Sequence, residues 1–424
     1  MSPSGHFYIH YDLSGNDSPS QDDNNFNGIP DYIDEVGIIA DSTRHVLLNI
    51  MGYNPEPPDD DGIYDIYIQD MGPYYYGLTV FDDQAGEEAG ASYMKIDNEY
   101  EEGDYFIPGI NTMRLTVAHE FFHAIQRGYR AYPNNATVFF YEMSSTWIED
   151  VIVPDGNDYL NWTGNFFNNP EIDIDDTDGY SIALYGHYLT QIVDEATNQM
   201  SSTIIKQMWE RFSLYNNAYN SIEYVLENQY STNFIDTWVD FCARNLYNSE
   251  FVDMDNEIYY YEDQMSANSI SYNIIDISQN NIFEDIILNN KSVIIKSINV
   301  VENYFTQITG ITDDIISAVA INSDITDITR FYNNDYIYAN SNGIIHILLG
   351  GYSNEMLDLV INNYQIGDTN QDYEINVLDI NIIINYIIAN ISLDSLDFSI
   401  SDMNVDGIIN VIDIVDIVNI ILDS

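Results

Sequence analysis

The chain contains one cysteine, Cys242, in 424 residues, so no disulfide can form within it. Lys and Arg total only 11 against 69 Asp and Glu, which leaves a formal charge of −58 at pH 7. Nucleic acids and anionic membranes bind basic surfaces, so the sequence predicts neither as a partner. No apolar run approaches the ~20 residues that cross a bilayer, so we also predict no membrane span.

The first residues, MSPSGHFYIHYD, lack the basic start and apolar run of a signal peptide. We still expect a secreted or cell-surface protein whose leader has been removed. Calcium can stabilise extracellular domains in place of disulfides, and the sequence is rich in candidate calcium ligands.

The motif HEFFH, from His119 to His123, is the most specific chemical signal in the sequence. Apolar residues around it recur at helical spacing, and on a helix two imidazoles four residues apart share a face. They can bind one metal ion while Glu120 acts as general base toward a water molecule. The alternative is two ordinary histidines on a half-buried helix.

A catalytic zinc needs a third protein ligand. The next helical segment, YEMSSTWIEDV, offers Glu142, 19 residues after His123, and Glu149, seven residues further on. Two helical turns, roughly 10 Å, separate these carboxylates, so both cannot easily bind one ion. We predict Glu142 as the ligand, with Glu149 as the runner-up or as a residue that orients a ligand.

HEFFH followed by EMSSTWIE resembles the gluzincin metallopeptidases. The resemblance implies that His119, His123 and Glu142 hold one zinc ion and that Glu120 activates the attacking water. Thr146 departs from the pattern, because thermolysin-like members have an Asp there that orients the first histidine. The residue that orients His119 is therefore left open.

Gluzincins also use a Tyr or His from a later helix to stabilise the oxyanion of the reaction. Apolar spacing predicts such a helix over residues 178–195. Tyr185 and His187 are the catalytic candidates, Tyr180 is a further one, and ordinary core aromatics are the alternative. The alternating segment 91–100 is predicted to be the edge strand along which a substrate would pair.

The C-terminus contains two twelve-residue loops, DTNQDYEINVLD and DMNVDGIINVID, at a 34-residue period. Oxygen-bearing side chains occupy the first, third, fifth, ninth and twelfth places, and the seventh supplies a backbone carbonyl, as in EF-hand-like calcium loops. The predicted ligands of the first ion are Asp368, Asn370, Asp372, Glu374, Asn376 and Asp379. Those of the second are Asp402, Asn404, Asp406, Ile408, Asn410 and Asp413.

These two loops, each followed by an apolar helix, closely resemble a dockerin. The resemblance implies two calcium ions and a cohesin-type protein partner; a calcium-stapled folding module without a partner is the alternative. The first loop departs at Tyr373, where glycine is usual because the turn needs permissive backbone angles. Gly407 obeys the rule in the second loop.

A third loop of the same spacing, DNNFNGIPDYID, lies near the N-terminus. We predict that it binds one calcium ion, and a polar surface turn is the alternative. Its predicted ligands are Asp23, Asn25, Asn27, Asp31 and Asp34.

We predict an α+β zincin-like catalytic domain over residues 1–255, an all-β sandwich over 256–365 and a small α-helical dockerin over 366–424. Short alternating segments between turn residues indicate the sandwich. The function predicted is a secreted zinc endopeptidase that acts on a protein or peptide and is tethered through its dockerin. A non-peptide amide substrate is a milder alternative. The main rival is a calcium-dependent adhesion or scaffold protein with a structural or silent zinc site.

Overall fold

The computed structural model describes residues 1–423 except 74, 82–89, 102–104, 131–132, 253–256, 276–279, 313–314, 323–325, 340 and 353. The chain forms two compact units, Met1–Thr237 with Arg244–Ser271, and Trp238–Ala243 with Tyr272–Ser424. The boundary predicted between residues 255 and 256 lies outside the described residues.

A four-stranded sheet in the order β1-β2-β4-β3 organises the first unit. Strands β1 (Phe7–His10), β2 (Tyr64–Gln69) and β4 (Ser92–Asp97) are parallel, and β3 (Gly77–Phe81) is antiparallel to β4. The segment predicted as the edge strand contains β4, which is interior because it pairs on both sides. The edge strands are β1 and β3, and β3 is the one that contacts the helix of the HEFFH motif.

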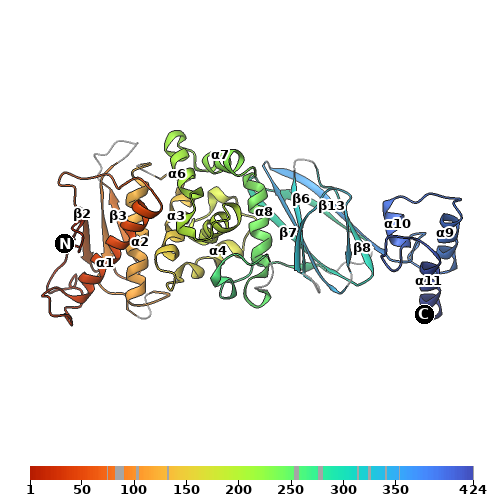
Figure 1. Cartoon of the computed structure of the whole chain (residues 1–424), viewed down its shortest axis with the longest axis horizontal. Coiled ribbons are helices and arrows are strands. Elements are labelled where there is room, and N and C mark those ends of the chain that lie inside the picture. Colours follow the sequence, from red (N-terminus) through yellow and green to blue (C-terminus); the bar gives the residue numbers. More distant parts are fainter. Residues whose placement is uncertain are drawn as a thin grey trace. The chain divides into compact units, whose positions relative to one another are not determined.

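Helices α1 (Asp31–His45) and α2 (Ile110–Gln126) pack against this sheet (Figure 1). Phe121 of α2 makes edge-to-face contacts with Phe7 and Tyr64, at ring distances of 5.1 and 5.5 Å. These contacts bury one face of α2 and leave an adjacent face for the two histidines. The other helices are α3 (Val138–Ile152), α4 (Gly164–Phe167), α5 (Ala183–Tyr188), α6 (Ile204–Tyr215), α7 (Ala218–Gln229) and α8 (Phe234–Arg244).

Two sheets that share one apolar core form most of the second unit. The first has the order β10-β9-β12-β7-β5 and the second the order β11-β8-β13-β6. Their bounds are β5 (Ile274–Ile275), β6 (Asn280–Leu288), β7 (Ser292–Val300), β8 (Tyr304–Thr309), β9 (Ile316–Asn322), β10 (Thr326–Arg330), β11 (Tyr336–Ala339), β12 (Gly343–Gly351) and β13 (Glu355–Gln365).

The core between these sheets explains the alternating sequence pattern. Ile345, Ile347 and Leu349 of β12 point into it together with Leu359 and Ile361 of β13. This is the arrangement of a β-sandwich, in which every second residue of a strand faces the opposite sheet.

The C-terminal segment contains α9 (Val377–Ile387), α10 (Ser395–Ser401) and α11 (Val411–Asp423). Asn376 and Asp379 form a capping box at the start of α9, so the first calcium loop runs directly into its helix. Ile383, Ile409 and Ile417 form the small core beneath the helices. Across the described residues, no helix combines the length and the apolar character that crossing a membrane requires.

Candidate metal centre

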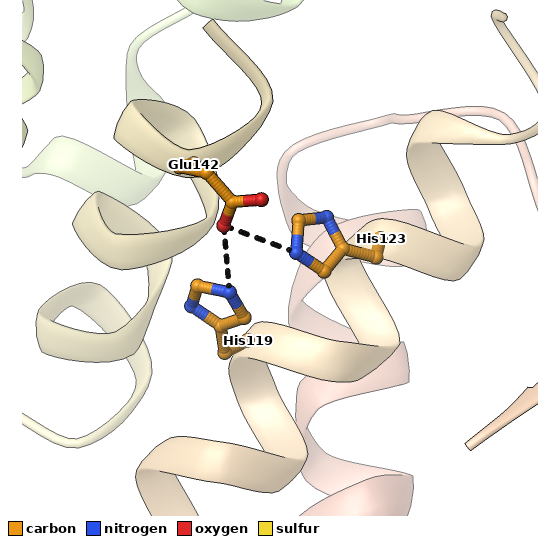
Figure 2. A group of neighbouring side chains, drawn as sticks. All are labelled: His119, His123 and Glu142. Atoms are coloured by element: carbon orange, nitrogen blue, oxygen red, sulfur yellow. Dashed lines mark hydrogen bonds and ion pairs between the residues drawn. The ribbon is translucent and has the colours of Figure 1, made fainter. Parts of the chain in front are cut away.

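Helices α2 and α3 bring His119, His123 and Glu142 together (Figure 2). The Nε2 atoms of the two histidines lie 3.2 and 3.3 Å from the same atom, Oε2 of Glu142. Ligand atoms around a tetrahedral ion with bonds of about 2.0–2.1 Å lie roughly 3.3 Å apart, so these separations match two edges of a zinc site. This is the one group of three or more such side chains with metal-binding spacing among the described residues.

Glu149 occupies the opposite side of the His119 ring. Its Oε1 lies 2.6 Å from Nδ1 of His119, whereas Glu142 faces Nε2. The seven-residue spacing that prevents both carboxylates from binding one ion therefore places them on the two nitrogens of one imidazole. Glu149 performs the orienting role that Thr146 cannot, because the Thr146 hydroxyl is buried and makes no hydrogen bond within the described part of the chain.

Gln126 fixes the ring of His123 in a similar way. Its Oε1 lies 2.7 Å from Nδ1 of His123, and its amide nitrogen donates to the carbonyl of Tyr141 and to the hydroxyls of Ser144 and Ser145. A backbone carbonyl can only accept, so the orientation of the Gln126 amide is determined. Nδ1 of His123 must then donate, which leaves the Nε2 lone pair directed at Glu142.

Three electron-pair donors thus converge on one point, and the arrangement attracts a cation. Burial alone lowers the pKa of His119, but hydrogen bonds to Glu142 and Glu149 outweigh it and hold that pKa well above its usual value. Burial opposes ionisation of Glu142, yet His123 and His119 hold its pKa far below the normal range. Once a metal ion displaces the Nε2 protons, two neutral imidazoles and one carboxylate remain, each imidazole oriented by an acceptor on its other nitrogen, and this set fits the ligands of a zinc site.

Glu120, the predicted general base, is buried beside this group and is held by the edge strand. The hydroxyl of Thr79 in β3 lies 2.6 Å from Oε2 of Glu120 and 2.8 Å from its carbonyl oxygen. Gly77 of the same strand comes so close to α2 that an added Cβ would lie 2.6 Å from Thr116 and 2.9 Å from Cγ of Glu120. Only glycine permits this approach.

Tyr180 is the aromatic residue that the structure brings to the metal group. Its ring stacks on His119 at a centroid distance of 5.6 Å and an interplanar angle of 1°. Gly179 precedes it with φ of +83°, and an added Cβ would lie 2.6 Å from both Cβ of Glu142 and the carbonyl of Phe139. The close turn at Gly179 therefore seats Tyr180 against α3.

Tyr185 and His187, the two catalytic candidates, lie away from this group. The hydroxyl of Tyr185 is fully buried and bonds to Thr237 at 2.7 Å. His187 stands 3.6 Å from Asp150 and lines a separate cavity of about 310 Å³. The predicted helix over 178–195 is broken into a 3-10 turn, α5 and a π-helical turn. Helical spacing across the whole segment therefore pointed to residues one or two turns too late.

The three candidate calcium loops share one hydrogen-bonding pattern. The first carboxylate of each accepts the backbone N–H groups of the fifth and sixth residues, as Asp368 and Asp402 do at 2.7–3.2 Å. Asp23 accepts from Asn27 and Gly28 in the same way, at 3.1 and 2.9 Å. The other predicted ligands of each site lie within the same twelve-residue loop. Calcium binding by the N-terminal loop remains a prediction.

Comparison with known proteins identifies the C-terminal module. Residues 366–422 match the dockerin type I domain, which confirms the prediction of a calcium-binding dockerin and implies tethering to a cohesin. No curated protein shows a significant match to the chain. The solved structure of Salmonella Typhimurium PliG, a periplasmic lysozyme inhibitor of g-type lysozyme, aligns over 22% of this chain and all of its own, with 4% identity and a TM-score of 0.20. That likeness is too slight to indicate a shared fold.

The two dockerin loops predict a measurable difference in calcium binding. Tyr373 has φ of +71° where the second loop has Gly407 at +81°. A side chain in this left-handed conformation costs roughly 1–2 kcal/mol, and Tyr373 is 51% exposed. We expect Tyr373→Gly to tighten the first site roughly 3–10-fold. Calorimetric calcium titration measures the change.

The reciprocal variant is the control. An added Cβ at Gly407 meets no atom within 4 Å, so the new side chain does not clash at its base, and Gly407→Tyr should weaken the second site through its positive φ. Unchanged calcium affinity in both variants would show that the backbone at this place does not limit binding.

Proposed function

We propose that the chain is a secreted or cell-surface zinc endopeptidase, anchored through its dockerin. The proposal depends chiefly on the convergence of His119, His123 and Glu142 with the carboxylate of Glu120 beside them. A structural zinc site is closed by four protein ligands, whereas only three converge here among the described residues. A position is thus left open for a water molecule or a substrate.

The residues around this open position have the roles that amide hydrolysis requires. A zinc ion held by the three ligands would supply Lewis-acid polarisation of a carbonyl and would favour ionisation of water. Glu120 takes the proton from the attacking water and delivers it to the leaving amine. Thr79 keeps the Glu120 carboxylate in place for both transfers.

Tyr180 is the proposed oxyanion donor, in place of Tyr185 and His187. Its ring lies against His119, and its phenol interacts with Glu142. Burial, followed by the charge of Glu142, raises its pKa well above the usual value, so its hydroxyl keeps the proton that it must donate. A hydrogen-bond donor stabilises the transition state only when it points at the oxygen on which charge develops. A neutral phenol beside the metal group could take this orientation.

The edge strand supplies the proposed substrate-binding surface. Strand β3 pairs with β4 on one side and has no strand partner on its other side among the described residues. An extended peptide can add to such an edge through its main chain. Thr79 and Gly77 of this strand contact Glu120, so a peptide bound there would pass the proposed base.

Digestion of a peptide library tests the proposal directly. The zinc-loaded protein should cleave peptides internally, a chelator should stop cleavage, and added zinc should restore it. Absence of cleavage by protein that contains one zinc ion per chain would overturn the proposal and favour an adhesion or scaffold role with a silent metal site.

A further inference from the structure

A cavity of about 270 Å³ opens beside Glu120 and His119. Pockets that hold drug-sized molecules usually span ~300–1,000 Å³, so this one suits a single long side chain. Its walls combine aromatic rings with carboxyl groups, and no lysine or arginine lines it within the described part of the chain. The lining includes Tyr76, Leu115, Glu149, Asp158, Trp162 and Tyr180.

Asp158 is the carboxyl group of this cavity that has no role in the metal group or in the proposed hydrolysis. It begins the 3-10 turn Asp158–Asn161 and is 3% exposed. Trp162 and the backbone of Ile107 hydrogen-bond to its carboxylate. Its Oδ1 atom is buried without a hydrogen-bond partner among the described residues. A buried acceptor without a donor is costly, so a ligand that supplies the donor would be bound favourably.

The aromatic walls fit the same kind of ligand. Trp162 stands 5.5 Å from Tyr180 and 6.5 Å from Tyr76 between ring centroids. Ring faces attract ammonium and guanidinium groups, and the methylene stems of Lys and Arg pack on apolar surface. The same walls next to Glu120, Glu149 and Asp158 disfavour an acidic side chain by charge repulsion.

We propose that this cavity is the subsite for a lysine or arginine side chain next to the scissile bond, and that Asp158 determines this specificity. The inference rests on the proposed peptidase function and names its substrate class. The cation would pair with the carboxylate of Asp158 after that side chain turns Oδ1 toward the cavity, and its stem would lie along Trp162. A neutral side chain of the same length would leave Oδ1 unpaired.

The pKa of Asp158 agrees with an unfilled cation site. Burial, followed by the charge of Glu149, raises this pKa to about 7. A carboxyl whose pKa is raised on folding destabilises the folded state above its unfolded pKa, because it must ionise in an unfavourable place. Asp158→Asn should therefore raise the melting temperature at pH 8, whereas a residue with a purely structural role would lower it.

Matched peptides that differ only at one position test the specificity. Lysine and norleucine have side chains of similar length, so the ratio of their kcat/KM values isolates the charge. We expect the wild-type protein to prefer lysine or arginine over norleucine by roughly 100-fold, and Asp158→Asn to remove most of that preference. Asp155→Asn, an exposed neighbour outside the cavity, is the control and should retain it.

The possible outcomes distinguish failure of the proposed subsite from failure of the proposed peptidase function. Cleavage with equal rates for lysine and norleucine in the wild-type protein would overturn the subsite and leave the peptidase standing. If no peptide is cleaved, calorimetry with N-acetyl-arginine methylamide and its norleucine analogue still decides. Binding of the arginine compound alone, lost in Asp158→Asn, supports the site, and equal or absent binding of both contradicts it.

Discussion

Glu120→Gln is expected to reduce peptide cleavage by roughly 10²–10⁴-fold while bound zinc stays at one ion per chain. Glu120 lies beside the three proposed ligands and outside their group, so its charge is not needed to hold the ion. Glutamine keeps the size of the side chain and can still accept a hydrogen bond from Thr79. It cannot take a proton from water, which is the step assigned to Glu120.

Elemental analysis and single-turnover cleavage, performed on the same sample, measure the two quantities. Glu227→Gln, an exposed change of the same chemistry on α7, is the matched control and should leave both unchanged. Full turnover in zinc-loaded Glu120→Gln would require a different general base and would contradict the proposed mechanism.

Replacing Glu142 and Glu149 of α3 singly by alanine should distinguish the ligand from the residue that orients it. Glu142→Ala removes one of three ligands, and we expect zinc affinity to fall by more than roughly 10³-fold. Glu149→Ala keeps all three ligands and loses only the acceptor behind His119, so we expect a fall of about 10–100-fold. Competition with a chromogenic chelator measures both.

The order of these two effects is the critical observation. A larger loss in Glu149→Ala than in Glu142→Ala would make Glu149 the ligand and Glu142 the orienting residue. Ile152→Val provides a reference for a small change on the same helix, because Ile152 is the last residue of α3 and is not part of the metal group.

Local spacing explains which parts of the site could be predicted. The i, i+4 histidines and the carboxylate 19 residues later depend only on helical geometry, and the structure brings these three together. The hydrogen bond from His119 to Glu149 depends on how two helices pack, which no single-segment pattern encodes. Glu149 was nevertheless available from the seven-residue spacing as a carboxylate that could not share the ion.

Predictions that depended on where a helix is interrupted or on how distant strands pair were less accurate. The sequence predicts the oxyanion donor on a continuous helix, whereas Gly179 with its positive φ turns the chain there and brings Tyr180, the proposed donor, to the metal group. The sequence predicts the segment containing β4 as the edge strand because it alternates and precedes α2. Sheet order is set by long-range pairing, which placed the shorter β3 outside it. The dockerin repeat needed no such information, because its ligands lie within single twelve-residue loops.

The position of His119 between two carboxylates of one helix links metal binding to the alignment of α2 and α3. Both nitrogens of the ring are matched to residues two turns apart on α3, so any slide of α3 along α2 disturbs both contacts at once. The polar contacts of Gln126 with Ser144 and Ser145 hold that alignment. Retention of the proposed zinc ion should therefore depend on helix register, and we expect a destabilising substitution in this interface to release the ion before the domain unfolds.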